Sequence, residues 1–242
     1  MNKPIIGIVS NKTSSKEKPF DDFTKFINNY PRRIIEEGAV PIGLLAPDGN
    51  IDEEILNICD GFLFTGGSLI ESWQLNVMHY AIENKKPVLG ICLGMQTMAG
   101  YAYLKNKLGK LSYDIINDNY TSKDEKSFLK KCESHDNLNP FYIKDIEKSK
   151  HKIMLKENSL IYSIFKQKNI IEPSLHNYSV IPNVIQNSEI FEIKGMSDDG
   201  IIEVLEYKDN SNFVLGVQFH PELENINKKL FEMFINSAKN KK

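Results

Sequence analysis

The sequence has few cysteines, little net charge and no long apolar run. Three cysteines without regular spacing in 242 residues form no disulfide framework and argue for a reducing compartment. A formal net charge of −2 gives no reason to expect nucleic acid or a membrane surface as a partner. No segment approaches the roughly 20 apolar residues of a membrane-spanning helix, and the start, MNKPIIGIVSN, lacks a signal-peptide layout. We therefore expect a cytoplasmic protein.

What is present is the composition of an ordinary globular protein, with 41% hydrophobic and 26% charged residues. The length suffices for one large core. In the first half, short apolar runs alternate with stretches of helical spacing, and this predicts an α/β fold with a doubly wound, mostly parallel sheet flanked by helices. No linker divides the chain, so we expect a single domain, 1–242. The expected strands of this half are 4–9, 39–45, 61–65 and 88–91.

Later segments follow other patterns. Residues 105–150 are rich in Lys, Asp, Asn and Ser, and we expect loops and short pieces over the site. Asp198-Asp199-Gly200 lies between two apolar-rich runs and predicts an antiparallel hairpin. Near the N-terminus, residues 12–22 are expected to form a solvated loop, and the helical spacing from Phe23 to Tyr30 is interrupted by Pro31.

The stretch KPVLGICLGMQTMAG, residues 86–100, organises the chain. It is typical of a strand, a sharp turn at Cys92 and a helix, with Gly90 and Gly94 allowing strand and helix to approach closely. At such a turn the helix N-terminus favours a thiolate, and backbone N–H groups can bind a reacting oxygen. A buried core cysteine explains this pattern alone equally well.

Two further spots follow predicted strands: Gly66-Gly67 after GFLFT and His220 after FVLGVQF. Ligands of open parallel sheets bind beyond the carboxyl ends of the strands, so we expect both spots beside Cys92. In extended chain, His220 and Glu222 point the same way, and Glu222 can orient the imidazole. A strand-end histidine and a surface carboxylate are the simpler interpretations of each residue alone, but together with Cys92 they favour catalysis.

The motifs GICLGMQ and GVQFHPE resemble the two signature motifs of the class I glutamine amidotransferase superfamily. The stretch MSDDGIIEVLEY, with SLHNYSV before it, resembles the gamma-glutamyl hydrolase branch. The resemblance implies a flavodoxin-like fold and a triad of a cysteine nucleophile (Cys92), a histidine base and acid (His220) and an orienting carboxylate (Glu222). It also implies an oxyanion hole formed by the amides of Gly67 and Leu93.

The resemblance further implies that Gln96 holds the glutamyl group and that Ser174 and His176 line the pocket. A solvated helix position for Gln96 and an ordinary loop histidine for His176 stay open as alternatives. Two departures from the gamma-glutamyl hydrolase pattern concern the site: Leu93 stands, as in amidotransferases, where many of these hydrolases have arginine, and Gly66-Gly67 lacks the aspartate that usually follows shortly.

The leading expectation is a hydrolase that cleaves the gamma-glutamyl amide bond of a small conjugate, such as gamma-glutamyl-GABA, through a gamma-glutamyl thioester. The alternatives are a glutaminase subunit that supplies ammonia to a separate synthetase, and a non-catalytic binding protein. We expect no metal, because the CxxH spacing of Cys132 and His135 has no second ligand pair. We also expect no cofactor, and the glycines lack the spacing of a P-loop or dinucleotide fingerprint. Cys59 is expected in the core. A homodimer stays open.

Overall fold

The computed structural model describes residues 2–14, 22–132 and 146–239. Within them, the largest element is a nine-stranded sheet of order β4-β1-β5-β6-β13-β12-β11-β8-β9. Its strands are β1 (Ile5–Val9), β4 (Val40–Leu44), β5 (Gly61–Phe64), β6 (Val88–Ile91), β8 (Lys150–Leu155), β9 (Asn169–Pro173), β11 (Phe191–Ser197), β12 (Ile202–Tyr207) and β13 (Val214–Val217).

The first five strands of this order run parallel, because β1 pairs with β4 and β5, and β6 pairs with β5 and β13. Every residue of β5, β6 and β13 is buried, as continuous apolar strands of a sheet covered on both faces should be. The register places Phe64 opposite Gly90 and Val217 opposite Ile91. The carboxyl ends of these three strands therefore meet side by side.

The other half of the sheet is antiparallel, from β13 through β12, β11 and β8 to β9. The predicted hairpin joins β11 to β12, with Gly200 at φ +79° in its turn. The α/β fold with a mostly parallel sheet is thus confirmed, but the antiparallel part is larger than one hairpin because β8 and β9 extend it.

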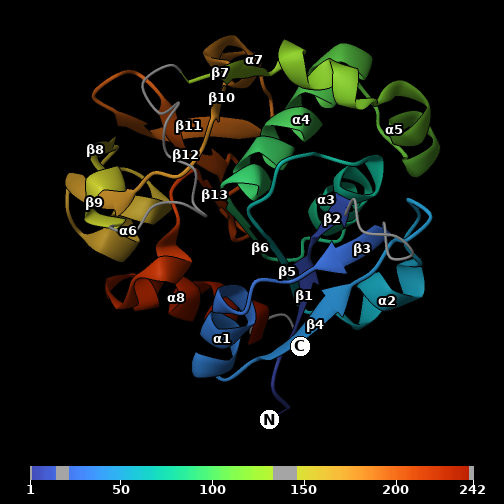
Figure 1. Ribbon diagram of the computed structural model, residues 1–242, viewed down its shortest axis with the longest axis horizontal. Helices are drawn as coiled ribbons and strands as arrows, with labels where there is room; N and C mark the ends of the chain where they lie inside the picture. Colours follow the sequence, from blue (N-terminus) through green and yellow to red (C-terminus); the bar gives the residue numbers. More distant parts are fainter. Residues whose placement is uncertain (1, 15–21, 133–145, 240–242) are drawn as a thin grey trace.

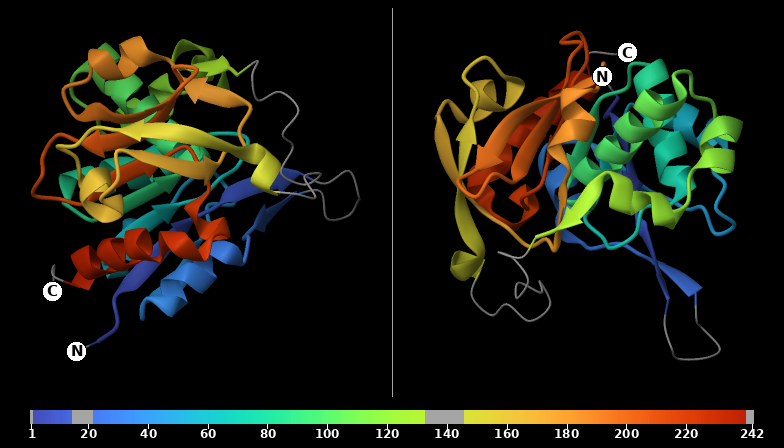
Figure 2. Two further views of the ribbon diagram at one scale, coloured as in Figure 1. Left: turned by 90° about the vertical axis from the view of Figure 1, so that its left-hand side faces the viewer. Right: turned by 90° about the horizontal axis from the view of Figure 1, so that it is seen from above.

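Helices cover both faces of the sheet (Figures 1 and 2). On one face, α1 (Asn29–Glu36), α6 (Leu160–Phe165) and α8 (Lys228–Lys239) bury residues such as Ile34, Ile161 and Phe231 in one core. Residues of the other helices, such as Leu75 and Met98, belong to a second core on the opposite face. These helices are α2 (Glu53–Ile58), α3 (Ser72–Glu83), α4 (Leu93–Leu108), α5 (Tyr113–Asn119) and α7 (Pro182–Gln186).

The expectation of a loop over residues 12–22 is partly wrong. Asn11–Ser14 (β2) and Asp22–Lys25 (β3) pair as an antiparallel ribbon that extends away from the rest of the chain (Figure 2); residues 15–21 lie outside the described residues. Pro31 does not interrupt a helix either. It lies in the first turn of α1, where a backbone N–H has no intrahelical acceptor and its absence costs nothing.

Residues 105–150, expected to form loops and short pieces, contain mainly short regular elements where the structure describes them. Helix α4 continues to Leu108, α5 packs against α3, a 3-10 helix follows at Ser122–Ser127, and β7 (Leu129–Lys131) pairs with β10 (Tyr178–Val180). Residues 133–145 lie outside the described residues. No helix in the described part of the chain is long and apolar enough to cross a bilayer.

Candidate active site

Cys92 occupies the sharp turn that the sequence predicts between β6 and α4. Its backbone has φ +54° and ψ −105°, a conformation that costs a non-glycine residue of order 1–3 kcal/mol and needs support from its surroundings. The Cys92 N–H donates to the carbonyl of Val217 (2.8 Å), and the Cys92 carbonyl accepts from the Gln96 N–H (3.2 Å). The neighbouring strand and the helix thus hold the turn from both sides, and Cys92 as a residue is 6% exposed.

The glycines on either side of Cys92 are required by close packing. A Cβ on Gly90 would lie 2.7 Å from the carbonyl carbon of Gly94, and a Cβ on Gly94 would lie 2.5 Å from the carbonyl oxygen of Phe64. Both obstacles are backbone atoms, which cannot rotate away. Strand β6, strand β5 and the start of α4 therefore meet at a distance that only glycine permits.

His220 and Glu222 form a buried pair beyond the end of β13. The Nδ1–H of His220 donates to Oε1 of Glu222 across 2.7 Å, and the two residues are 9% and 3% exposed. A Cβ on Gly66 would lie 3.1 Å from Cε1 of His220 and 3.5 Å from Cβ of Cys92. The imidazole and the cysteine thus both lie close to the Gly66 backbone, and the structure brings the three predicted triad residues together.

The ionisation of this group favours a thiolate beside an imidazolium. Burial is the largest single effect and raises the pKa of the Cys92 thiol, but the charge and hydrogen bond of His220 together with the charge of His176 outweigh it, so the pKa is lowered. Burial also opposes protonation of His220, yet the negative charges of Glu222 and Cys92 raise its pKa well above the ordinary value. An ion pair of this kind makes a cysteine nucleophilic near neutral pH.

Two backbone amides near the thiol are candidates for binding an oxyanion. Leu93 is the first residue of α4, so its N–H has no acceptor inside the helix. In the turn after β5, the Gly66 N–H donates to the Tyr30 hydroxyl (3.0 Å), whereas the Gly67 N–H has no acceptor among the residues that the structure describes. Of the amides of Gly66 and Gly67, expected to be free, only that of Gly67 stays available among the described residues, and its role in an oxyanion hole stays a prediction.

Helix α1 supplies two residues that the sequence analysis missed. Tyr30 is buried, and burial together with the charges of Glu222 and Cys92 raises the pKa of its hydroxyl, so the phenol stays protonated. Arg33, one turn later, donates from Nε to the backbone carbonyl of Glu222 (3.2 Å) and from Nη1 to Asn225 Oδ1 (2.7 Å). An aromatic residue at helical spacing indicates only a core position, so nothing in the local pattern pointed to this role.

Gln96 and Ser174 are both buried, at 4% and 1% exposure. Nε2 of Gln96 donates to the carbonyl of Tyr178 (2.9 Å) and to Oε1 of Gln218 (3.1 Å), so the alternative of a solvated helix position is wrong. The Ser174 N–H donates to the Ser149 carbonyl (2.9 Å). Their binding of a glutamyl group stays a prediction.

His176 is not an ordinary loop histidine, because it belongs to a buried group of charges. Its Nε2 lies 3.5 Å from Oε1 of Glu203, which is also 3.2 Å from Nε2 of His151. Although burial opposes protonation, Cys132 and Glu203 raise the pKa of His176 to about 10. The resulting positive charge also lowers the pKa of Cys92, so His176 acts on the thiol electrostatically.

The remaining cysteines and histidines that the structure describes have structural partners. Cys59 is fully buried, and its thiol contacts the Ile55 carbonyl (3.3 Å). His79 Nδ1 lies 3.0 Å from the Tyr101 hydroxyl. His135 lies outside the described residues, and among the described ones no group of three or more potential ligands could hold a metal ion.

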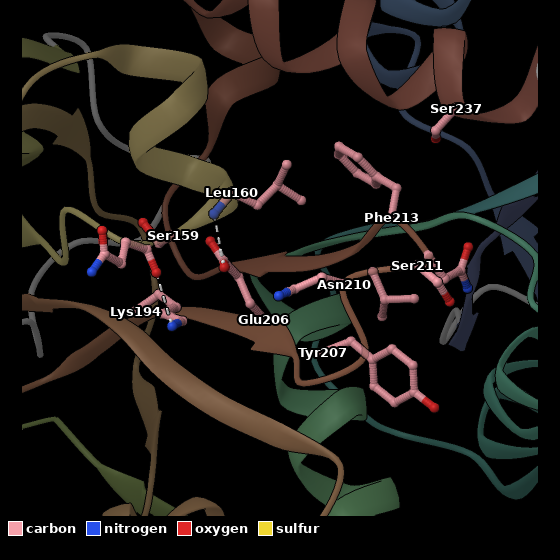
Figure 3. A pocket seen from close by; sticks show the side chains of 12 residues that line it. Ser159, Leu160, Lys194, Glu206, Tyr207, Asn210, Ser211, Phe213 and Ser237 are labelled. Carbon is pink, nitrogen blue, oxygen red and sulfur yellow. Dashed lines mark hydrogen bonds between the residues drawn. The ribbon is translucent and has the colours of Figure 1, made fainter.

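A cavity of about 590 Å³ lies beside the N-terminal end of β13. Figure 3 shows the side chains that line it. It includes Val214, where β13 begins, whereas His220 follows the end of that strand. The Glu206 carboxylate in its wall accepts from the N–H groups of Leu160 (2.9 Å) and Ile161 (2.7 Å). The cavity is thus separate from the group around Cys92.

A buried carboxylate, Glu172, precedes the strand end that supports His220. Its neighbour Pro173 accepts the His220 N–H (3.2 Å). Glu172 is 2% exposed and accepts from Nδ2 of Asn227 (2.8 Å). Burial, with a smaller effect of the Glu224 charge, raises the pKa of Glu172 to about 7, against the opposing effects of Asn227 and Lys150.

This pKa predicts a pH-dependent stability. Between about pH 4.5 and 7 the folded protein binds a proton at Glu172 that the unfolded chain releases, so stability falls as pH rises through this range. The difference between 4.5 and about 7 corresponds to at most about 3 kcal/mol. We expect Glu172→Gln to increase the free energy of unfolding at pH 8 more than at pH 5, measured by urea denaturation. The exposed Glu157→Gln should show no such difference, and an equal effect of Glu172→Gln at both pH values would contradict the prediction.

Comparison with known proteins identifies the family. The model of the family Peptidase C26 matches residues 4–71 and 70–222, and the two matches meet just beyond the Gly66-Gly67 turn. The chain is 32% identical over 215 residues to a CTP synthase of Methanosphaera stadtmanae, covering 84% of this chain and 38% of that protein. It is 30% identical over 179 residues to a CTP synthase of Mycoplasmopsis pulmonis, covering 72% and 32%. The chain thus spans about a third of the length of these relatives.

Solved structures share the fold at lower identity. The glutaminase domain of Trypanosoma brucei CTPS with bound acivicin has a TM-score of 0.66 at 16% identity, covering 98% of this chain and 94% of that one. A glutamine amidotransferase of Thermotoga maritima has a TM-score of 0.57 at 12% identity, covering 100% and 86%.

These findings correct the leading expectation from the sequence. The relatives carry the name CTP synthase, so the expected hydrolase of small gamma-glutamyl conjugates is wrong, and the glutamine amidotransferase alternative is the better supported of the two. The misleading signal was the stretch around SLHNYSV and MSDDGIIEVLEY, whereas Leu93 already agreed with amidotransferases. With a family match over most of its length, the chain belongs to Peptidase C26, a class I glutamine amidotransferase-like family.

Proposed function

We propose that this chain hydrolyses the side-chain amide of glutamine and that the released ammonia is used by a synthetase domain or subunit. The observation that carries the proposal is the grouping of Cys92, on a strained turn, with the buried His220–Glu222 pair. The amides of Gly67 and Leu93 are the proposed oxyanion donors. A nucleophile, an oriented base and donors for an oxyanion are the parts that acyl transfer requires.

In the proposed reaction, the Cys92 thiolate attacks the amide carbon of glutamine. The oxygen of the tetrahedral adduct accepts hydrogen bonds from the Gly67 and Leu93 amides, and losing one such donor typically costs ~10²–10³ in rate. His220 gives a proton to the departing nitrogen, so ammonia leaves and a gamma-glutamyl thioester remains. His220 then takes a proton from water, which attacks the thioester and releases glutamate. Glu222 keeps the imidazole oriented in both steps.

The relatives are named CTP synthase, and this chain matches only about a third of each. This supports the proposal that a synthetase uses the ammonia that the chain releases. Gln96, Ser174 and His176 remain the proposed substrate-binding residues.

Glutamate release from glutamine by the purified protein tests the proposal. We expect turnover with glutamine, faster than with gamma-glutamyl conjugates, and none with Cys92→Ala. Adding the protein to a CTP synthase that lacks glutaminase activity should restore CTP formation from glutamine more strongly than the same amount of free ammonia does. Undiminished turnover by Cys92→Ala would refute the mechanism, and equal stimulation by free ammonia would refute the direct supply of a CTP synthase.

A further inference from the structure

The side chain of Asn11, the first residue of β2, covers the Gly66-Gly67 turn. Its Nδ2 donates to the Gly66 carbonyl (2.9 Å) and to the Thr65 hydroxyl (3.2 Å), and its Oδ1 accepts from Nε2 of Gln74 (3.3 Å). The sequence analysis did not single out Asn11, because a polar residue after a strand is typical of any loop. Its contacts come from segments more than 50 positions away.

The orientation of the Asn11 amide is fixed by the network around it. Gln74 accepts the Glu71 N–H at Oε1 (2.9 Å) and donates from Nε2 to the Ser10 carbonyl (2.8 Å). Nε2 of Gln74 therefore faces Asn11 and requires an acceptor there, which is Oδ1. The NH₂ group of Asn11 consequently points at the turn.

The hydrogen bond to the Gly66 carbonyl determines where the Gly67 N–H points. The Gly66 carbonyl and the Gly67 N–H belong to the same peptide group, and in a planar trans peptide these two bonds point in opposite directions. Holding the oxygen toward Asn11 thus turns the N–H away from Asn11. The peptide cannot flip without breaking this bond.

The contact also explains the glycine at position 67. A Cβ there would lie 2.3 Å from Cγ of Asn11 and 2.4 Å from its Nδ2 and Oδ1. Position 67 is not among the glycines with positive φ, so its backbone conformation is open to other residues. The Asn11 amide can occupy its observed position because residue 67 is glycine; a residue with a Cβ would displace it.

We propose that Asn11 is a positioning residue that orients the Gly67 amide toward the oxyanion formed at Cys92. The inference rests on the proposed hydrolysis of glutamine. Asn11 touches the turn and not the reacting atoms, so it acts through Gly67. Gly66 is held at its other end by Tyr30, and the two side chains together define the turn.

The test compares glutamine hydrolysis with alkylation of Cys92 by iodoacetamide, which needs the thiolate but no oxyanion donor. Asn11→Asp has nearly the same size, lacks the NH₂ donor and places a carboxylate against the Gly66 carbonyl. We expect Asn11→Asp and Asn11→Ala to lower kcat by about 10- to 100-fold, below the ~10²–10³ typical of losing a donor outright. KM and the alkylation rate should stay near those of the unmodified protein.

Asn212→Ala is the matched control. Asn212 is also buried, at 7% exposure, and its Nδ2 also donates to a backbone carbonyl, that of Lys86 (3.1 Å), but it precedes β13 at the opposite edge of the sheet. This variant should keep its kcat.

Each outcome bears on one of the two claims. An unchanged kcat in both Asn11 variants overturns the positioning role alone, as does a loss of kcat matched by an equal loss of alkylation rate. Absence of glutamine hydrolysis by the unmodified protein, alone and with an added synthetase, overturns the proposed function and this inference with it.

Discussion

His220→Asn is expected to lower kcat for glutamine hydrolysis by at least about 10³-fold, the scale seen when one member of a catalytic triad is removed. Asparagine can still donate a hydrogen bond to the buried Glu222 carboxylate, so the fold keeps that contact, but it neither takes up nor delivers a proton. Steady-state release of glutamate measures the loss.

The same variant should change the pH dependence of Cys92 alkylation. In the unmodified protein the charge of His220 lowers the pKa of the thiol against the effect of burial. Without that charge burial prevails, so the pKa of Cys92 rises and alkylation at pH 7 becomes slow, accelerating only in more alkaline solution.

His79→Asn is the control for both measurements, since His79 is a partly buried histidine of α3 that contacts Tyr101. It should leave turnover and alkylation unchanged. A His220→Asn protein with unaltered alkylation at pH 7 would mean that the imidazole does not set the ionisation of Cys92.

Gly94→Ala is expected to cost both stability and activity. The new Cβ would lie 2.5 Å from the carbonyl oxygen and 2.7 Å from the Cβ of Phe64, so α4 must move away from β5. Overpacking of a close-packed core typically lowers the free energy of unfolding by about 1–3 kcal/mol. Here the nearest obstacle is a backbone oxygen, which cannot rotate away as a side chain could. Because Leu93 and Cys92 precede Gly94 directly, the thiol and a proposed oxyanion donor would be displaced together.

Chemical denaturation and glutamine turnover of Gly94→Ala measure the two effects. Gly109→Ala serves as a control for stability alone: a Cβ at Gly109 meets nothing within 4 Å, but the positive φ of +75° makes any side chain strained. Gly109→Ala should therefore lose stability and keep turnover. Full activity of Gly94→Ala would show that strand and helix tolerate a wider spacing than the structure has.

The sequence determined the local elements around the site. Runs such as PIIGIV and FVLGVQF predict buried strands because only a sheet covered on both faces lacks polar alternation. Glycines on both sides of Cys92 predict a strand and a helix in close contact. The two-residue spacing of His220 and Glu222 predicts that their side chains meet if the chain is extended; they do meet, but across a 3-10 turn at Pro221–Leu223. Each of these depends on neighbours in the chain, whose geometry is fixed by the backbone.

The expectations from the sequence were wrong where contacts between distant segments determine the structure. The ribbon of β2 and β3 and the long antiparallel edge depend on strand pairing, which apolar patterns do not specify. The sequence analysis expected Pro31 to interrupt a helix, because the spacing of apolar residues alone did not show that α1 begins at Asn29. The choice of gamma-glutamyl hydrolase over amidotransferase depended on segments outside the triad, and the comparisons reversed it.

Only the tertiary structure decided which strands are neighbours and what surrounds the thiol. The order β5-β6-β13 places the Gly66-Gly67 turn, Cys92 and His220 at one edge, although up to about 150 positions separate them along the chain. Asn11 and Tyr30 form hydrogen bonds with the turn, and Arg33 forms one with the backbone carbonyl of Glu222. The Glu203 carboxylate stabilises the protonated form of His176. Hydrogen bonds and charges act through space over a few ångströms, so their partners are fixed by packing and leave no mark in sequence spacing.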